Sequence, residues 1–215
     1  ELSSCQVWWF FALNCLAFAA ACLLFLPNWL PIALSLPVLV LICGYSLAKR
    51  FTSAAHLWLG VALALSPICA WVAIRGEQVI ADPSDLLPAC VLGLAIALWV
   101  AGFDVIYACQ DAEFDRRAGL HSLPARFGVK GALRISSLLH AAMLIVLACL
   151  PIFFARLSLG WIYWFALAGV SALVVRQHAI VRPGDLGRVN EAFFNINAII
   201  SFGLCSAAAV DACLR

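Results

Sequence analysis

Charged residues are scarce in this sequence, and their scarcity sets the class of protein. Asp, Glu, Lys and Arg make up 11% of the 215 residues, whereas 66% are apolar and the mean hydropathy is +1.05. Such a chain has too few polar side chains to cover a water-soluble surface of this size. We therefore expect a membrane protein. The net charge of +2 says little about partners, and no nucleic-acid partner is expected.

Several other features are missing, and each absence narrows the possibilities. No Ser- or Gly-rich linker, low-complexity tract or clear internal repeat interrupts residues 1 to 215, so a single transmembrane domain is expected. The ten Cys form no C-x-x-C pair and do not align with the four His in a zinc or haem pattern. We expect most of these Cys to be small buried hydrophobic residues.

Long apolar runs predict an all-α, polytopic bundle with seven transmembrane spans. A run of roughly 18 to 22 apolar residues crosses the hydrocarbon as a helix, because the backbone has no water to bond with there. The expected spans are 5 to 26, 30 to 47, 57 to 74, 86 to 109, 135 to 155, 158 to 175 and 192 to 210.

The basic residues gather on one side of this predicted topology. Loops 49 to 56, 110 to 134 and 176 to 191 share one side of the membrane and hold Lys49, Arg50, Arg116, Arg117, Arg126, Lys130, Arg134, Arg176, Arg182 and Arg188. The other side holds only Arg75, Arg156 and Arg215. The positive-inside rule places the first set of loops in the cytoplasm. The ends of the spans carry Trp29, Trp58, Trp71, Trp161 and Trp164, as expected at a membrane interface.

Carboxylates concentrate in "GFDVIYACQDAEFDRRAGLHSLPARFG", residues 102 to 128. If the fourth span continues as one helix through Phe114, offsets of seven and eleven residues place Asp104, Asp111 and Asp115 on one face, with Tyr107 close to it. An ionised Asp facing lipid costs several kcal/mol, so Asp104 should line a cavity inside the bundle.

The spacing of Asp111 and Asp115 favours a Mg²⁺ site. Two carboxylates one helical turn apart, together with substrate phosphates, are typical ligands of Mg²⁺. The alternative is that both simply pair with Arg116, Arg117 or Arg126 at a solvated helix end. The deeper Asp104 and the nearby basic residues favour the metal site.

Cations at the same membrane face suit a diphosphate. Lys49, Arg50 and His56 lie in "GYSLAKRFTSAAHLWLG" and are candidates for binding phosphate, although basic residues beside a span are expected in the cytoplasm whatever the function. His140, inside a span, is expected to be hydrogen-bonded structure. Asn195 and Asn197 could cap a helix, bond between helices or contact substrate.

Three stretches resemble the UbiA-type intramembrane prenyltransferases, most closely the 4-hydroxybenzoate polyprenyltransferase branch. They are "YSLAKRFTSAAHLWLGVALALSPICAWVA", residues 102 to 128, and "HAIVRPGDLGRVNEAFFNINAIIS", in the order found in that family. The middle stretch is similar to the family's second aspartate-rich motif. The resemblance implies nine transmembrane helices around a central cavity, with Mg²⁺ held between two aspartate-rich motifs and an allylic diphosphate.

The sequence departs from this pattern at its start. The first motif, N-x-x-x-D-x-x-x-D, and the two helices expected before it are absent, and the chain opens at Glu1 without a basic leader. The expectation is therefore the C-terminal three quarters of an enzyme, with seven of nine spans. Alone it should lack a complete metal site and be inactive.

The resemblance also implies a reaction. Asp111 and Asp115 would bind Mg²⁺, and with Lys49 and Arg50 draw off the diphosphate from a polyprenyl diphosphate. The ring of an aromatic acid, 4-hydroxybenzoate or a dihydroxynaphthoate, would attack the allylic cation in ubiquinone or menaquinone biosynthesis. Asp104 or Tyr107 would steer the acceptor or assist proton loss, and Asn195 is a further substrate-binding candidate. A bacterial inner membrane is the expected location.

Two other functions remain open from the residues. A proton-coupled transporter also uses intramembrane acids, but it predicts acids distributed across the membrane, whereas these cluster at one face. A Mg²⁺-dependent transferase acting on nucleotide-linked lipids should show D-G-x-x-A-R, which does not occur. Acceptor identity, prenyl length and oligomeric state are not indicated by the sequence.

Overall fold

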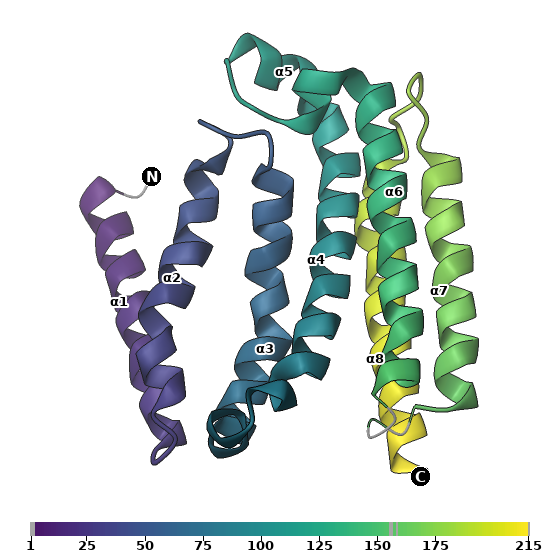
Figure 1. Cartoon of the computed structure of the whole chain (residues 1–215). Helices are drawn as coiled ribbons and strands as arrows, with labels where there is room; N and C mark the ends of the chain where they lie inside the picture. Colours follow the sequence, from purple (N-terminus) through teal and green to yellow (C-terminus); the bar gives the residue numbers. More distant parts are fainter. Residues whose placement is uncertain (1–2, 155–156, 158, 215) are drawn as a thin grey trace.

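The computed structural model describes residues 3 to 154, 157 and 159 to 214, and their architecture is an antiparallel bundle of long helices (Figure 1). The described residues contain no β-strand, so the all-α prediction is confirmed. In chain order the helices are α1 (Ser4–Cys22), α2 (Leu30–Ala48), α3 (Ala55–Ala81), α4 (Leu87–Ala108), α5 (Ala112–Arg117), α6 (Leu123–Phe153), α7 (Trp161–Ile180) and α8 (Asn197–Cys213). A π-helix, Glu191–Ile196, directly precedes α8.

Seven of these helices correspond to the seven expected spans, and α5 is a short extra helix. Six spans of the described chain are long and apolar enough to cross a membrane; they comprise α1 to α4, α6 and α8 with adjoining turns. Helix α7 lies at the edge of the bundle beside α6 and α8 (Figure 1) but is not one of the six. Near its C-terminal end α7 carries Arg176, Gln177 and His178, which lower its hydropathy.

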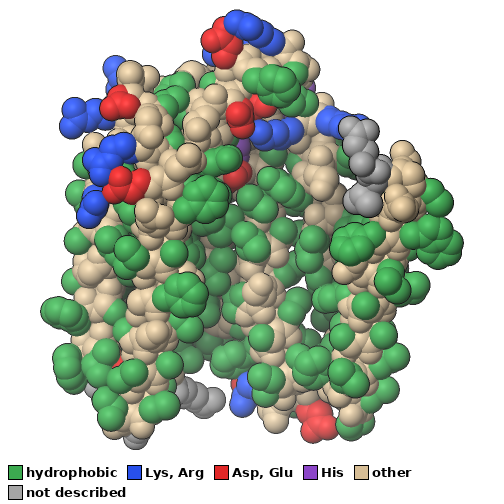
Figure 2. Space-filling model, turned by 180° about the vertical axis from the view of Figure 1, so that it is seen from behind, with side chains coloured by type: hydrophobic (Ala, Val, Ile, Leu, Met, Phe, Trp, Pro, Cys, Tyr) green, Lys and Arg blue, Asp and Glu red, His purple; other side chains and the backbone are tan. Residues whose placement is uncertain are grey.

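Charged side chains concentrate at the end of the bundle where α5 lies, here called the α5 end. Figure 2 shows most blue and red side chains at this end and a largely green middle. The three connections predicted to be cytoplasmic meet here, with the basic residues assigned to them, while Arg75 lies at the opposite end. Arg156 and Arg215, the other two residues of the predicted outer set, lie outside the described residues.

One buried acid lies at the end opposite α5, away from the face where the sequence analysis placed the cluster of acids. Asp211, near the end of α8, is 1% exposed, and its carboxylate accepts the backbone N–H groups of Gly160 and Tyr163. These groups belong to the first turn of α7, where backbone donors lack partners within the helix. Asp211 therefore caps α7, which is a structural role.

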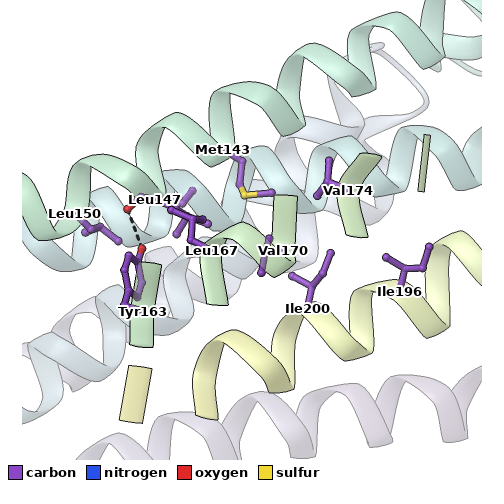
Figure 3. Packing of buried hydrophobic residues seen from close by; sticks show 10 residues of the cluster. Met143, Leu147, Leu150, Tyr163, Leu167, Val170, Val174, Ile196 and Ile200 are labelled. Atoms are coloured by element: carbon purple, nitrogen blue, oxygen red, sulfur yellow. Dashed lines mark hydrogen bonds between the residues drawn. The ribbon is translucent and has the colours of Figure 1, made fainter. Parts of the chain in front are cut away.

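The main core fills the space between α4, α6, α7 and α8. Figure 3 shows its apolar side chains pointing toward one another, and the Tyr163 hydroxyl donates to the Leu147 carbonyl at 2.8 Å. Only two Cys, Cys22 and Cys109, are buried, so the prediction that most Cys are buried was wrong. The other Cys lie at partly or fully exposed positions on helices whose outer faces suit lipid.

Helices α3 and α4 approach so closely that backbones touch. A Cβ on Gly60 would lie 2.3 Å from the Ala97 carbonyl oxygen, and one on Gly93 would lie 3.1 Å from the Ala64 carbonyl oxygen. Small residues at such contacts are how membrane helices gain packing energy without a hydrophobic driving force. The close contact fixes α4, and hence Asp104, against α3.

Gly60→Ala is expected to destabilise the protein by about 3 kcal/mol, because overpacking against a rigid backbone forces the two helices apart. The measurement is thermal unfolding in detergent, with Gly169→Ala as the matched control. A Cβ on Gly169 in α7 meets nothing within 4 Å, so this variant should unfold at the wild-type temperature or slightly above it. Equal unfolding temperatures for the two variants would contradict the close α3–α4 contact.

Candidate functional site

Three carboxylates of the stretch 102 to 117 lie at the α5 end, in three consecutive helical segments. Asp104 is in α4, Asp111 ends a 3₁₀ turn (Cys109–Asp111), and Asp115 is in α5. The expected single α-helix with all three on one face was wrong. A 3₁₀ turn advances by about 120° per residue instead of about 100°, and Asp111 has φ −96° and ψ 4°. Asp111 is exposed, whereas Asp115 is buried.

Asp115 forms an ion pair that joins α5 to the end of α2. Its Oδ2 atom accepts a hydrogen bond from Lys49 Nζ at 3.2 Å, and its side chain is 2% exposed against 32% for Lys49. Sequence analysis also considered an ion pair of Asp115 with Arg116, Arg117 or Arg126, but the partner of Asp115 in the structure is Lys49. Arg117 pairs with Glu113, and Arg126 donates to Ser53 Oγ. The predicted cation and one predicted metal ligand are therefore brought together.

The loop after α5 is held on the same part of α2. The His121 backbone N–H donates to the Lys49 carbonyl at 2.7 Å, and the Leu120 N–H donates to the Asp115 carbonyl at 2.8 Å. Gly119 makes this turn possible with φ +67°, a conformation that other L-residues rarely adopt. Two backbone contacts and one ion pair thus fix the position of the Asp115 carboxylate.

Asp104 forms a second polar pair, which the sequence analysis missed. Its Oδ2 atom lies 2.6 Å from His56 Nδ1 in α3, and the imidazole is 1% exposed while Asp104 is 15% exposed. The Leu123 N–H points to His56 Nε2 at 3.5 Å. Because Nε2 accepts this contact, Nδ1 carries the proton and donates to Asp104. His56 therefore links α3, α4 and the start of α6, and aims Asp104 inward.

Three predicted site residues remain open to a ligand. Asp111, Arg50 and Asn195 are exposed, and the structure assigns their side chains no hydrogen bond or ion pair with the described residues. Tyr107 is half-buried, and its ring contacts that of Phe193 at a tilt of 41°, with centroids 4.5 Å apart. Asn195 lies on the π-helix beside Phe194, a kind of distortion that is frequent at functional sites.

The donor set at Asp111 and Asp115 suits Mg²⁺ only with oxygen ligands from elsewhere. Within the part of the chain that the structure describes, no group of three or more His, Cys, Asp or Glu side chains is placed to hold a metal ion. Mg²⁺ commonly uses one or two carboxylates and completes its shell with water and substrate phosphates. Exposed Asp111 and the anchored Asp115 fit that pattern.

A row of aromatic rings leads from these carboxylates into the bundle. Tyr107, Phe193, Phe103 and Trp99 follow one another, with centroid distances of 4.5, 5.2 and 5.6 Å between neighbours. Trp99 also lines an apolar chamber of about 460 Å³ between α3, α4, α6, α7 and α8, whose other walls include Met143 and Leu147. A polar entrance and an apolar interior are thus arranged along α4.

Two further polar residues have structural partners. His140 is fully buried, with Nδ1 2.9 Å from His178 Nε2 and Nε2 3.2 Å from the Trp99 carbonyl, so its expected structural role is supported. The side-chain Oδ1 of Asn197 accepts from Trp99 Nε1 at 3.2 Å and from Gln177 Nε2 at 3.3 Å. Of the two asparagines, Asn197 is thus committed to bonds between helices.

Comparison with known proteins gives a consistent picture. Residues 1–199 match the model of the UbiA prenyltransferase family. The chain is 32% identical to the 4-hydroxybenzoate octaprenyltransferase of Chromohalobacter salexigens over 186 residues, which are 86% of this chain and 58% of that protein. It is 34% identical to the enzyme of the same name from Methylobacillus flagellatus over 171 residues, 79% of this chain and 54% of that protein.

A solved structure is also similar. The apo structure of a UbiA homolog from Aeropyrum pernix K1 superposes with a TM-score of 0.83 at 31% identity, covering 98% of this chain and 74% of that one. The chain therefore spans less than two thirds of these curated relatives but nearly three quarters of the solved homolog.

Proposed function

Because the chain belongs to the UbiA prenyltransferase family, we propose that this integral membrane protein transfers a polyprenyl group from an allylic diphosphate to an aromatic acid, with Mg²⁺, in quinone biosynthesis. The observation that carries the proposal is the order of groups along α4. Carboxylates and cations occupy the α5 end, aromatic rings follow, and an apolar chamber lies beyond them. An amphiphile with an anionic head and an isoprenoid tail matches that order.

The diphosphate head is assigned to the α5 end. Mg²⁺, when bound with Asp111 and Asp115, supplies Lewis-acid stabilisation of the charge on the leaving diphosphate. Lys49 already lies 3.2 Å from Asp115, so its ammonium group is placed to share the same phosphate oxygens. Arg50 is adjacent and open to a second contact. Together these residues favour breaking the allylic C–O bond, with the electron pair leaving on the diphosphate.

The acceptor is assigned to the space beside Asp104 and Tyr107. The ring carbon ortho to the phenolic hydroxyl forms a bond to the allylic carbon, and the proton on that ortho carbon must then leave. Asp104, held by His56 at 2.6 Å, is the proposed base, and Tyr107 orients the aromatic ring. Asn195 is proposed to contact substrate from the π-helix. The rings of Phe103 and Phe193 lie beside Tyr107 and are proposed to limit the access of water to the cation.

The relatives narrow the acceptor. Both are named 4-hydroxybenzoate octaprenyltransferases, so we propose 4-hydroxybenzoate and ubiquinone biosynthesis over a dihydroxynaphthoate and menaquinone biosynthesis. We further propose that residues 1 to 215 form one domain, that the α5 end faces the cytoplasm, and that the bilayer is a bacterial inner membrane. The concentration of basic residues at the α5 end supports this orientation.

An acceptor assay tests the function. The protein at its natural full length, in liposomes with Mg²⁺ and radiolabelled octaprenyl diphosphate, is expected to give labelled product with 4-hydroxybenzoate. A dihydroxynaphthoate, offered separately, should give at least about tenfold less, since the acceptor's polar groups must match buried partners. Product only with the naphthoate would reassign the pathway. No product with any aromatic acid would favour proton-coupled transport through the carboxylates instead.

A further inference from the structure

Two side-chain amides hold the π-helix Glu191–Ile196 in place. Gln177, near the end of α7, donates through Nε2 to the Ala192 carbonyl at 2.8 Å. Asn197, at the start of α8, donates through Nδ2 to the Phe193 carbonyl at 2.8 Å. These two carbonyls belong to the peptide groups on either side of Phe193. The backbone on both sides of one aromatic residue is therefore fixed by side-chain donors.

The two amides are also bonded to each other and to α4. Gln177 Nε2 donates to Asn197 Oδ1 at 3.3 Å, and Trp99 Nε1 donates to the same oxygen at 3.2 Å. Gln177 and Asn197 are both buried, and side-chain amides in such positions bond helices to one another inside a membrane. Three connected side chains thus link α4, α7 and α8 at the level of the π-helix.

The oxygen of the Gln177 amide shows which half of this side chain the structure uses. Within the described residues, Oε1 of Gln177 is buried and has no hydrogen-bond partner. The opposite orientation of the amide would place Oε1 against the Ala192 carbonyl oxygen, and two acceptors would then face each other. An unpaired buried acceptor destabilises a folded protein, and an apolar side chain of the same length would avoid it. Gln177 therefore contributes through its Nε2 donor.

Phe193 lies against the space beside Asp104 and Tyr107 that is assigned to the aromatic acid, here called the acceptor space. The Phe193 ring is 4.5 Å from that of Tyr107 and 5.2 Å from that of Phe103, measured between centroids. Backbone hydrogen bonds in a π-helix join residues five apart instead of four. A change to a regular α-helix would shift Phe193 by one position relative to α8, about 100° around the axis. Such a shift would separate Phe193 from Tyr107.

We propose that Gln177 is a positioning residue for the aromatic acid, because with Asn197 it holds the π-helix so that Phe193 and Tyr107 form one side of the acceptor space. The inference rests on the proposed function. Gln177 is fully buried, so it acts through Phe193 and not by contact with the acid. The diphosphate is assigned to the carboxylates and cations of the α5 end, and its binding should not depend on Gln177.

Gln177→Met tests this role, because methionine keeps the length of the side chain and removes both the donor and the unpaired acceptor. In the full-length protein, KM for 4-hydroxybenzoate is expected to rise at least about tenfold, since a displacement of about 1 Å can cost up to about 100-fold. KM for octaprenyl diphosphate should change less than about twofold. The unfolding temperature should change little, because removal of the unpaired acceptor offsets the lost hydrogen bond.

A double-variant cycle separates positioning from a general structural effect. Phe193→Ala alone should also raise KM for the aromatic acid. If Gln177 acts through Phe193, adding Gln177→Met to Phe193→Ala should raise that KM less than about twofold further, because residues that act through one contact are not additive. Two increases that multiply in the double variant would overturn the inference.

Asn28 provides a matched control, because it is another amide that holds backbone carbonyls. From the connection between α1 and α2 it donates to the Val72 and Ala73 carbonyls of α3 at 2.8 and 3.1 Å, at the end opposite α5 (Figure 1). Asn28→Leu should lower the unfolding temperature and leave KM for the aromatic acid unchanged. An equal effect of Asn28→Leu and Gln177→Met on that KM would overturn the inference.

Two further outcomes would contradict the role of Gln177. They are an unchanged KM for the aromatic acid in folded Gln177→Met, and an equal rise in KM for both substrates. Should Gln177→Met not fold, Gln177→Asn decides in the same way, because its shorter amide does not reach the Ala192 carbonyl. Wild type without transfer to any aromatic acid would instead overturn the proposed function and the inference with it.

Discussion

Replacing both Asp111 and Asp115 with alanine is expected to lower prenyl transfer by at least about a thousandfold. Electrostatic stabilisation of the charge that develops on the leaving diphosphate should be the largest catalytic contribution here, and removal of one such group typically costs about 100- to 1,000-fold. The double variant removes both proposed Mg²⁺ ligands of this motif. It also leaves Lys49 without the carboxylate that holds its ammonium group at 3.2 Å.

The measurement compares kcat/KM over a range of Mg²⁺ concentrations in the full-length protein. Glu113→Ala is the matched control, because Glu113 is a carboxylate of the same helix but is exposed and pairs with Arg117. Exposed pairs contribute little, so this variant should keep wild-type activity. Equal activity of the double variant and Glu113→Ala would exclude Asp111 and Asp115 as Mg²⁺ ligands.

The single variants separate the two carboxylates. Asp115→Asn keeps the shape of a buried side chain that contacts Lys49 and should lower activity with little change in unfolding temperature. Asp111 is exposed, and no partner among the described residues depends on it, so Asp111→Asn should leave stability unchanged. If each variant lost activity only in proportion to the fall in its unfolding temperature, the two carboxylates would have a structural role.

The transmembrane helices could be predicted because their signal is local. Six long apolar runs are enough to predict six helices, because a single segment inside a bilayer can pair its backbone N–H and C=O groups with one another only as a helix. Helix α7 was also predicted, as the span 158 to 175, but it continues to Ile180 through polar residues, and Gln177 is buried and donates to the Ala192 carbonyl at 2.8 Å. Gln177 lowers the hydropathy of α7, yet its hydrogen bond helps to hold α7 against the π-helix that precedes α8.

The site was only partly predictable, because its pairs are distant in the sequence. The positions of Lys49 and Asp115 were identified, but their contact joins residues 66 apart. His56 and Asp104 are 48 apart, and the sequence predicted one as a possible phosphate ligand and the other as a cavity-lining acid on the face of Asp111 and Asp115, without their contact. The 3₁₀ turn that ends at Asp111 had no clear sequence signal, and it interrupts the single α-helix that the prediction of a shared face assumed.

The two asparagines illustrate the same limit. Asn195 and Asn197 are two residues apart on an expected helix, and the sequence offered the same roles for both. The π-helix ends between them, so that Asn197 turns toward Trp99 and Gln177 whereas Asn195 remains exposed. A distortion of the helix that depends on neighbouring helices thus decides which asparagine is available to a substrate.

Asp104→Asn is expected to lower kcat about 100-fold or more, the usual contribution of a positioned base, with little change in KM for the diphosphate. The amide keeps the shape of the carboxylate and can still accept the proton of His56 Nδ1, so the fold should be retained. What it loses is the negative charge that would receive the ring proton. Within the described residues, the structure assigns no donor to the second carboxylate oxygen, Oδ1, which is therefore available for that role.

Two readouts distinguish a base from a structural residue. With an acceptor deuterated at the reacting ring carbon, the variant should show a primary isotope effect that wild type lacks, because proton loss becomes rate-limiting. His56→Asn, which retains a donor near the position of Nδ1, should preserve more activity than His56→Ala, since the donor keeps Asp104 oriented. If Asp104→Asn turned over at the wild-type rate, proton transfer to Asp104 would be excluded. The pair with His56 would then serve only to fix α4 against α3 beside the acceptor.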